Sequence, residues 1–241
     1  MPREMEPWRK PVPRPLLPPA LRRPAALLLA GCAAVTVSLA LAFTHQARPG
    51  WLDAGVDARI RGGLGGYQRP MQDLASLGGQ VSVTVLTAAL VLACLTARRW
   101  RGAVLACVAV PAAVALTDFV LKPLVGRTIR GYTCFPSGHA TAMFALAAAC
   151  AILLASPPRP RLPGTMRLLL ALGAGLVAAA VATAMVARGY HYFTDTVAGA
   201  AVGTGMVLLA ALIIDGARPA APAGHDEAAA STAALGAGRL A

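Results

Sequence analysis

Six apolar runs divide this chain, and each is about long enough to cross a lipid bilayer as a helix. A spanning helix needs roughly 17–25 apolar residues. The runs cover residues 25–44, 77–97, 102–121, 138–155, 168–187 and 196–214. Because lipid holds no water to pair with the backbone, each run must satisfy its own backbone hydrogen bonds as an α-helix. We therefore expect an all-α integral membrane protein with a six-helix bundle over residues 25–214.

The composition supports a membrane protein and argues against a nucleic-acid partner. Hydrophobic residues make up 57% of the chain and charged residues only 13%, whereas a soluble domain has about 25% charged residues. The net charge of +12 could indicate nucleic-acid binding, but the arginines fall in short gaps between apolar runs, which is typical of topology signals. The tails, residues 1–24 and 215–241, are rich in Pro, Arg, Ala or Gly, and we expect them to be disordered.

The basic residues also predict the orientation in the membrane. Of the 22 basic residues, 14 lie in the tails and in the loops after the second and fourth runs, and 8 lie in the other three loops. The positive-inside rule then places both termini in the cytoplasm of a multi-pass cell-membrane protein. The loops after the first, third and fifth runs face outward, and they carry the candidate functional residues.

A Pro-Ser-Gly-His segment, residues 136–139, opens the fourth apolar run. The first N–H groups of a helix lack partners and carry the positive end of its dipole, so they attract a phosphate. Gly138 lets a ligand approach the backbone closely, and Ser137 can cap the helix. Three cations precede the segment: Lys122, Arg127 and Arg130. We expect this region to bind a phosphate group.

A second polar segment precedes the sixth run and contains His191 and Asp195, with Arg188 just before it. Residues four apart share one face of a helix. A carboxylate against one imidazole nitrogen fixes the tautomer and leaves the other nitrogen free to attack. Alternating helices return His139 to the same membrane face, and histidine acts both as nucleophile and as general acid. The two segments together predict a phosphoryl-transfer site.

These segments resemble the three-part signature of the type 2 phosphatidic acid phosphatase superfamily, whose membrane branch has six helices and whose soluble branch includes vanadium haloperoxidases. The resemblance implies that His191 attacks phosphorus and is transiently phosphorylated, that Asp195 orients His191, and that His139 protonates the leaving oxygen. The groups implied to hold the phosphate oxygens are Lys122, the arginines, Ser137 and the Gly138 amide. The implied mechanism requires no metal or other cofactor.

The arginines depart from the family pattern at two positions. The first motif usually has an Arg seven residues after the Lys, where this chain has Ile129, so that either Arg127 or Arg130 would take the role. The third motif usually has an Arg six residues before the nucleophilic His, where this chain has Met185. Residues three apart on a helix are neighbours, so we assign that role to Arg188.

The leading hypothesis is a membrane phosphatase that hydrolyses a lipid phosphate or pyrophosphate at the outer membrane–water boundary. Undecaprenyl pyrophosphate and related polyprenyl carriers are the first candidates, and phosphatidic acid and phosphatidylglycerol phosphate come next. The alternatives are a lipid phosphotransferase that uses the same site and a non-catalytic lipid-binding or transport protein on the same scaffold. The five cysteines form no CxxC pair, which argues against a zinc or redox site. Both a monomer and a homodimer remain open.

Three further patterns predict local packing. Asp118 lies one turn before Lys122, and we expect the two side chains to pair. Gly199 and Gly203 form a GxxxG pattern, which favours close helix packing within the chain over dimerisation. Apolar residues over 51–60 approximate a helical spacing, which predicts an interfacial helix in the first outward loop.

Overall fold

The computed structural model describes residues 15–156 and 162–217, so most of both predicted tails lies outside the described residues. The helices are α1 (Pro19–Phe43), α2 (Trp51–Leu64), α3 (Gln68–Ser76), α4 (Gln80–Thr96), α5 (Trp100–Ala115), the π-helical turn η1 (Leu116–Leu121), α6 (Lys122–Val125), α7 (Gly138–Ala155), α8 (Gly164–Ala187) and α9 (Phe193–Gly216). A two-stranded antiparallel hairpin, β1 (Thr128–Ile129) and β2 (Tyr132–Thr133), separates α6 from α7.

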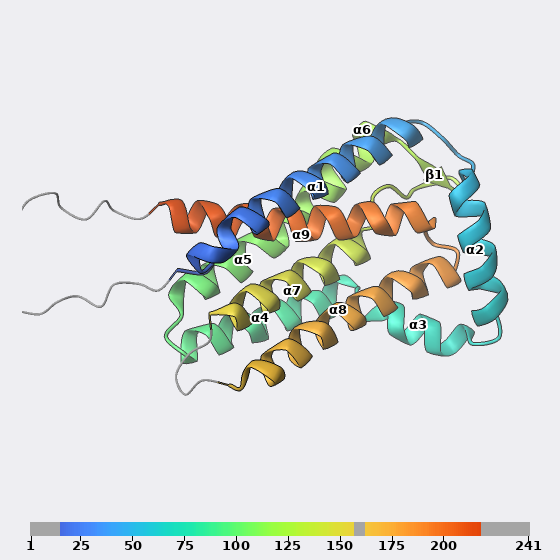
Figure 1. Cartoon of the computed structure of the whole chain (residues 1–241). Helices are drawn as coiled ribbons and strands as arrows, with labels where there is room; N and C mark the ends of the chain where they lie inside the picture. Colours follow the sequence, from blue (N-terminus) through green and yellow to red (C-terminus); the bar gives the residue numbers. More distant parts are fainter. Residues whose placement is uncertain (1–14, 157–161, 218–241) are drawn as a thin grey trace, which may run out of the picture.

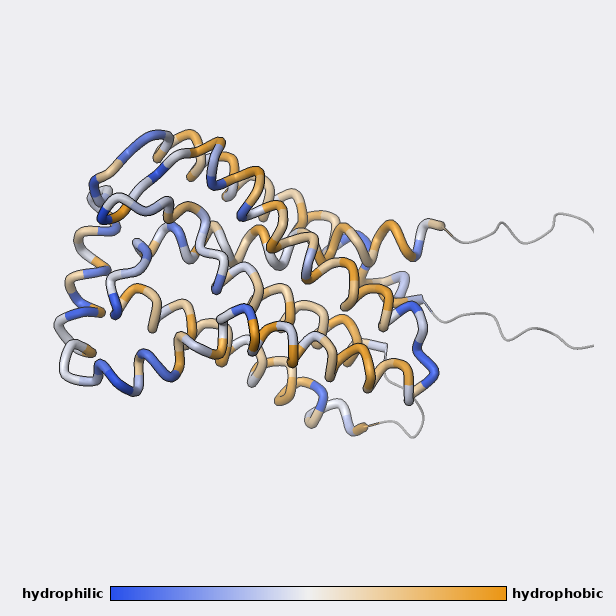
Figure 2. The backbone as a smooth tube through the Cα atoms, turned by 180° about the vertical axis from the view of Figure 1, so that it is seen from behind, coloured by the Kyte–Doolittle hydropathy of each residue, from blue (hydrophilic) through white to orange (hydrophobic). Residues whose placement is uncertain are grey.

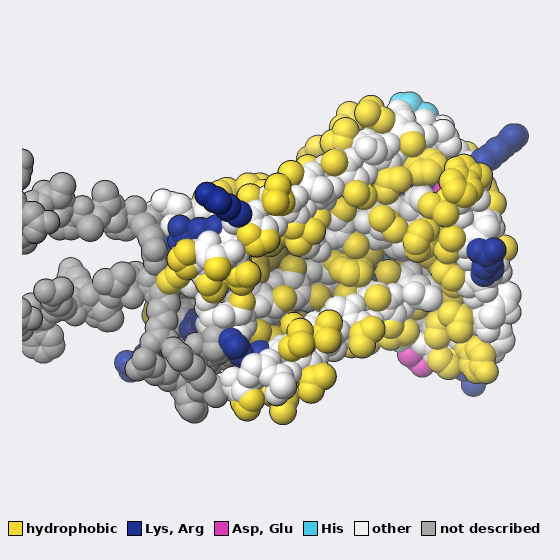
Figure 3. Space-filling view, viewed as in Figure 1, with side chains coloured by type: hydrophobic (Ala, Val, Ile, Leu, Met, Phe, Trp, Pro, Cys, Tyr) yellow, Lys and Arg dark blue, Asp and Glu magenta, His cyan; other side chains and the backbone are white. Residues whose placement is uncertain are grey.

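The long helices run side by side, and α2 lies across one end of the bundle (Figure 1). The first and last described segments lie together at the opposite end. Hydrophobic residues dominate the middle of the bundle and hydrophilic residues gather at its two ends (Figure 2). On the face shown in Figure 3, the Lys and Arg side chains likewise lie toward the ends, with hydrophobic side chains between them. This distribution is the one that a bilayer selects, because the hydrocarbon core excludes charge.

Five or six segments of the described chain are long and apolar enough to cross a membrane. Five of them qualify alone: α1, the continuous segment Trp100–Val125, α7, α8 and α9. The remaining apolar run forms α4, which has 17 residues and qualifies only together with α3, from which it is bent by 47°. All six predicted runs are therefore helical, and a count of six spans depends on taking α3 and α4 as one broken span.

The helical domain extends beyond the predicted boundaries of 25 and 214. α1 begins at Pro19, where proline's missing N–H costs nothing because the first turn has no partner for it. At the other end of the chain, the buried carboxylate of Asp215 accepts the N–H groups of Leu16 (3.0 Å) and Leu17 (2.8 Å) and pairs with Arg101 (3.3 Å). These bonds tie the start of α1 to the end of α9.

α7 and α9 pack closely at the predicted GxxxG pattern. A Cβ atom on Gly199 would lie 2.5 Å from the carbonyl oxygen of Ser137, and one on Gly203 would overlap the carbonyl oxygen of Thr141. The prediction of close packing within the chain is confirmed. The contact brings the N-terminal ends of α7 and α9, which carry the two polar segments, to one place.

The expected interfacial helix is present as α2, but its apolar residues do not attach it to the bundle. Its buried residues are Asp53 and Asp57, whereas the Trp51 side chain is 88% exposed. The apolar spacing therefore predicted the helix correctly, and hydrogen bonds and an ion pair of its buried aspartates hold α2 in place.

Replacing Gly203 with alanine should destabilise the protein by about 1–3 kcal/mol, since a methyl group there must force α7 and α9 apart. Gly175→Ala in α8 is the matched control, because a Cβ atom at Gly175 meets nothing within 4 Å. Thermal unfolding in detergent should show a lower midpoint for Gly203→Ala than for Gly175→Ala. Equal midpoints for the two variants would contradict the packing described here.

Candidate active site

A cavity of about 1150 Å³ extends from the hairpin and the start of α7 along α4 and α5. Its polar end is lined by His139, His191, Lys122 and Arg130. Its wall along α4 and α5 is apolar, with Val83, Val91, Val110 and Val114 among the lining residues. One cavity thus joins a cationic, histidine-containing end to an apolar wall within the bundle.

The imidazole of His191 is oriented chiefly by a backbone carbonyl. Its Nδ1 lies 2.8 Å from the carbonyl oxygen of Cys134 and 3.7 Å from Oδ2 of Asp195. The shorter distance is a hydrogen bond and the longer one is not, so Nδ1–H donates to Cys134. This tautomer leaves a lone pair on Nε2. The residues predicted to interact, His191 and Asp195, are neighbours, but the Cys134 carbonyl was not foreseen, because a backbone group gives no signal in a sequence.

Asp195 is fully buried and both of its carboxylate oxygens are occupied. Oδ1 lies 2.6 Å from Nη1 of Arg127, and Oδ2 accepts the N–H of Tyr192 at 2.9 Å. The backbone carbonyl of Asp195 accepts the N–H of Ser137 at 3.0 Å, which fastens the start of α7 to the start of α9. Asp195 therefore lies beside His191 and links the start of α7 to the start of α9.

Arg127 lies behind the cavity and does not line it. Its side chain is fully buried, and its guanidinium pairs with Asp53 at 2.5 Å and Asp195 at 2.6 Å. The same guanidinium stacks on the rings of Phe43 and Tyr192, with its carbon 3.8 and 4.3 Å from the ring centroids. Two carboxylates thus compensate the charge of Arg127, and the structure separates this residue from the predicted phosphate-binding set.

Two aspartates of α2 cap the start of α9. Oδ1 of Asp53 accepts the N–H of Thr194 at 2.9 Å, and Oδ1 of Asp57 accepts the N–H of Phe193 at 3.0 Å. Carboxylates are favourable at a helix N-terminus. Burial nevertheless raises the pKa of Asp57 to about 6, against the smaller lowering effects of the Phe193 N–H and Arg61. Neither aspartate was predicted, although two acidic residues four apart between the first two apolar runs were the available signal.

The two cations that do reach the cavity are Lys122 and Arg130. Lys122 pairs with Asp118 at 2.7 Å, as expected from their spacing. Asp118 belongs to the π-helical turn η1, and such turns are rare and often lie at functional sites. Arg130 occupies the two-residue turn of the hairpin with Gly131, and both have positive φ, 52° and 85°, as tight hairpins require. Arg130 makes no hydrogen bond or ion pair within the described residues.

Ser137 caps α7, whereas Gly138 lines the cavity; both had been predicted to bind phosphate. Ser137 is fully buried outside the cavity, and its Oγ accepts the N–H of Ala140 at 3.4 Å, so it acts as a helix cap. Gly138 lines the cavity next to His139. A Cβ atom on Gly138 would lie 3.5 Å from Oδ1 of Asp118 and 3.8 Å from Nζ of Lys122, so this backbone adjoins the ion pair.

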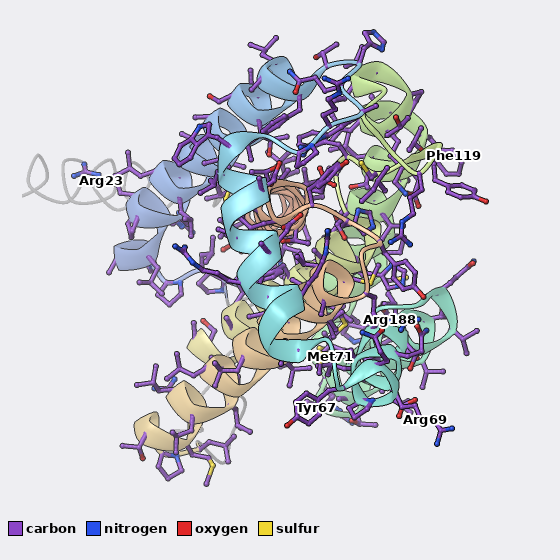
Figure 4. The ribbon with its side chains drawn as sticks, turned by 90° about the vertical axis from the view of Figure 1, so that its right-hand side faces the viewer. Arg23, Tyr67, Arg69, Met71, Phe119 and Arg188 are labelled. Atoms are coloured by element: carbon purple, nitrogen blue, oxygen red, sulfur yellow. The ribbon has the colours of Figure 1, made fainter. Side chains whose placement is uncertain are left out.

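Arg188 lies outside the cavity, next to α3 (Figure 4). It donates to Gln68, to Gln72 at 3.1 Å and to Tyr190 at 3.2 Å. Met185, at the position where the family has its arginine, is buried against α3. The structure does not bring Arg188 into the cavity with the histidines, because the last turn of α8 faces α3.

The described residues contain no group of three or more His, Cys, Asp or Glu side chains placed to hold a metal ion. The five cysteines are free. The polar end of the cavity offers two imidazoles, two cations, the Asp118 carboxylate that pairs with Lys122, and the backbone at the start of α7.

Fold and cavity define a helical membrane protein with a histidine site at one end of its bundle. The model of the PAP2 superfamily matches residues 24–219. The chain therefore belongs to the PAP2 superfamily, which confirms the resemblance seen in its motifs. No curated protein matches the chain by sequence.

A solved structure with a similar fold is described as the first transmembrane PAP2 type phosphatidylglycerolphosphate phosphatase from Bacillus subtilis. The two chains superpose with a TM-score of 0.60 and are 16% identical, and the match covers 80% of this chain and 97% of the other. At 16% identity the structural similarity establishes a shared fold and does not establish a shared activity.

The raised pKa of Asp57 predicts a specific pH dependence of stability. A carboxyl whose pKa is about 6 in the folded state and 3.8 ordinarily binds its proton more tightly when folded. Between about pH 4 and 6, the wild type should therefore lose stability as pH rises, by up to about 3 kcal/mol relative to Asp57→Asn. Melting midpoints in detergent over this pH range measure the difference.

Asp73→Asn is the control for this comparison, because Asp73 lies on α3 and its side chain is exposed. Its pH profile should run parallel to that of the wild type. A difference in melting midpoint between wild type and Asp57→Asn that stays constant from pH 4 to 7 would contradict the raised pKa of Asp57.

Proposed function

We propose that this protein is a phosphatase that hydrolyses a lipid phosphate or pyrophosphate through a phosphohistidine at His191. One observation carries the proposal: the Cys134 carbonyl occupies Nδ1 of His191, so Nε2 is available in a cavity that also holds His139, Lys122 and Arg130. Membership of the PAP2 superfamily supports a phosphatase.

The geometry supports a two-step reaction. Nε2 of His191 attacks phosphorus while the bond to the leaving oxygen breaks, and His139 gives that oxygen a proton. Water then attacks the phosphohistidine, His139 takes the proton from the water, and inorganic phosphate leaves with Nε2 restored. Lys122 and Arg130 stabilise the negative charge on the phosphoryl oxygens, which is the main requirement of phosphoryl transfer. The Gly138 backbone, at the positive end of α7, completes this surface.

The shape of the cavity supports a lipid substrate. Its apolar wall along α4 and α5 would hold an acyl or prenyl chain, while the phosphate meets the histidines at the polar end. Polyprenyl pyrophosphates are the first candidates, followed by phosphatidic acid and by phosphatidylglycerol phosphate, the substrate for which the structural neighbour is named. The site lies at the opposite end of the bundle from both described chain ends (Figure 1), so cytoplasmic termini would make it extracytoplasmic.

A non-catalytic lipid-binding protein is the second candidate, and the missing arginines favour it. Ile129 and Met185 occupy the positions at which the family usually has arginine, and Met185 is packed against Ala75 and Met71 instead of facing the cavity. This candidate predicts lipid phosphate binding without phosphate release.

Phosphate release from a panel of lipid phosphates by the detergent-purified protein separates the two candidates. His191→Asn should lower turnover at least about 1000-fold, because it removes the nucleophile. The control is His45→Asn, a histidine outside the cavity whose positive φ of 56° asparagine accepts. A chelator should leave turnover unchanged, since the proposed reaction uses histidines and cations of the chain. Full turnover by the His191→Asn variant would contradict the mechanism. Loss of wild-type turnover on addition of a chelator would contradict it as well.

Arg130 and Arg127 should respond to substitution in opposite ways. Arg130→Gln should lower kcat/KM by about 10- to 100-fold with an unchanged melting midpoint, because it removes a charged contact to phosphate. Arg127→Gln should destabilise the fold by about 3–5 kcal/mol, because it leaves Asp53 and Asp195 buried without their partner. Parallel kinetics and thermal unfolding test both, and a stable, inactive Arg127→Gln would return that residue to the phosphate site.

A further inference from the structure

A second, smaller pocket of about 430 Å³ adjoins the reaction cavity. Three of its lining residues are arginines from separate parts of the chain: Arg61 of α2, Arg130 of the hairpin turn and Arg188 at the end of α8. No carboxylate and no residue of α4 or α5 lines it. It is therefore a cationic pocket that lacks the apolar wall of the reaction cavity.

Neutral groups hold Arg188 in place. Its acceptors are the side-chain oxygens of Gln68, Gln72 and Tyr190, and Figure 4 shows it beside α3 near Met71. Amide and phenol oxygens orient a guanidinium without cancelling its charge. Arg188 is thus a fixed cation whose charge remains available to an anion.

The other two arginines leave a positive balance. Arg61 donates to the carbonyl of Val186 at 3.2 Å and pairs with Asp57 at 3.1 Å, and Asp57 also accepts the N–H of Phe193. Arg130 has no bonding partner among the described residues. The only carboxylate paired with these three guanidinium groups within the described residues is therefore Asp57, which does not line the pocket.

The two pockets meet at Gly189, two residues before His191. Arg130, Gly189 and Tyr190 line both of them. Gly189 has a φ of +70°, and a Cβ atom there would lie 3.2 Å from Nη2 of Arg130 and 4.0 Å from Nε of Arg61. The absence of a side chain at Gly189 thus leaves room for Arg130 over the backbone that leads to His191, and Arg61 lies on the same side of that backbone.

We propose that Arg61, Arg130 and Arg188 form a second phosphate-binding subsite beside the phosphate that reacts. Guanidinium groups match phosphate oxygens with pairs of charge-assisted hydrogen bonds. Two sources could supply the ligand: inorganic phosphate released from His191, or a further phosphate group on the substrate. The role in turnover rests on the proposed function, whereas phosphate binding to the pocket does not.

The binding test uses thermal unfolding of the full chain in detergent with increasing inorganic phosphate, at ionic strength held constant with chloride. All variants carry Lys122→Gln, which weakens the reaction cavity and leaves the three arginines intact. Adding Arg61→Gln and Arg188→Gln should raise the phosphate concentration for half of the midpoint shift about tenfold. Adding Arg69→Gln instead should change nothing, because Arg69 of α3 projects away from the bundle (Figure 4). Equal phosphate responses in all three proteins would overturn the subsite.

Turnover then distinguishes the two sources in otherwise wild-type protein. If the subsite holds released phosphate, Arg61→Gln with Arg188→Gln should raise the product-inhibition constant of phosphate about tenfold with every substrate. If it holds a substrate phosphate, KM should rise about tenfold for a lipid pyrophosphate and stay constant for a lipid monophosphate. Unchanged constants would overturn the role in turnover. Absence of turnover on all lipids would overturn the proposed function alone, since the binding test needs no catalysis.

Discussion

The buried guanidinium of Arg127, held between the carboxylates of Asp53 and Asp195, is the interaction on which the site depends. Charges without water are costly unless they are paired and hydrogen-bonded, and here the pairing joins α2, the loop before the hairpin and α9. Asp195 in turn accepts the N–H of Ser137 through its backbone, so the start of α7 is fixed as well. The ends of three helices are thereby set around His191.

This arrangement gives the basic residues at this end of the bundle different surroundings. Arg127 is buried and pairs with Asp53 and Asp195. Lys122 and Arg130 line the cavity, whereas Arg188 and Arg61 line the neighbouring pocket. Arg127, between its two carboxylates, cannot reach a phosphate, Lys122 shares its charge with Asp118, and Arg130 has no partner among the described residues. The chain can therefore lack both usual family arginines and still present positive charge where a phosphate would enter.

The sequence predicted those features that depend on local spacing. The apolar runs became helices, α7 begins at Gly138 as expected, and Asp118 pairs with Lys122. The choice between Arg127 and Arg130 could not be made, because it depends on a tight turn that points one side chain outward and on a buried partner, Asp53, 74 residues away. The contact between the Cys134 carbonyl and His191 could not be predicted for a different reason. Every residue carries a backbone carbonyl, and only the folded structure shows which one lies next to the imidazole.

The account depends most on His191 being the nucleophile that accepts the phosphoryl group in the first step, so direct detection of the phosphorylated intermediate tests it best. The protein would be mixed with a lipid phosphate, quenched in alkali within the first turnover, digested and examined by mass spectrometry. The account predicts a phosphoryl group on His191 and on no other residue. A phosphoryl group elsewhere, or active turnover with no phosphoenzyme at any quench time, would contradict it.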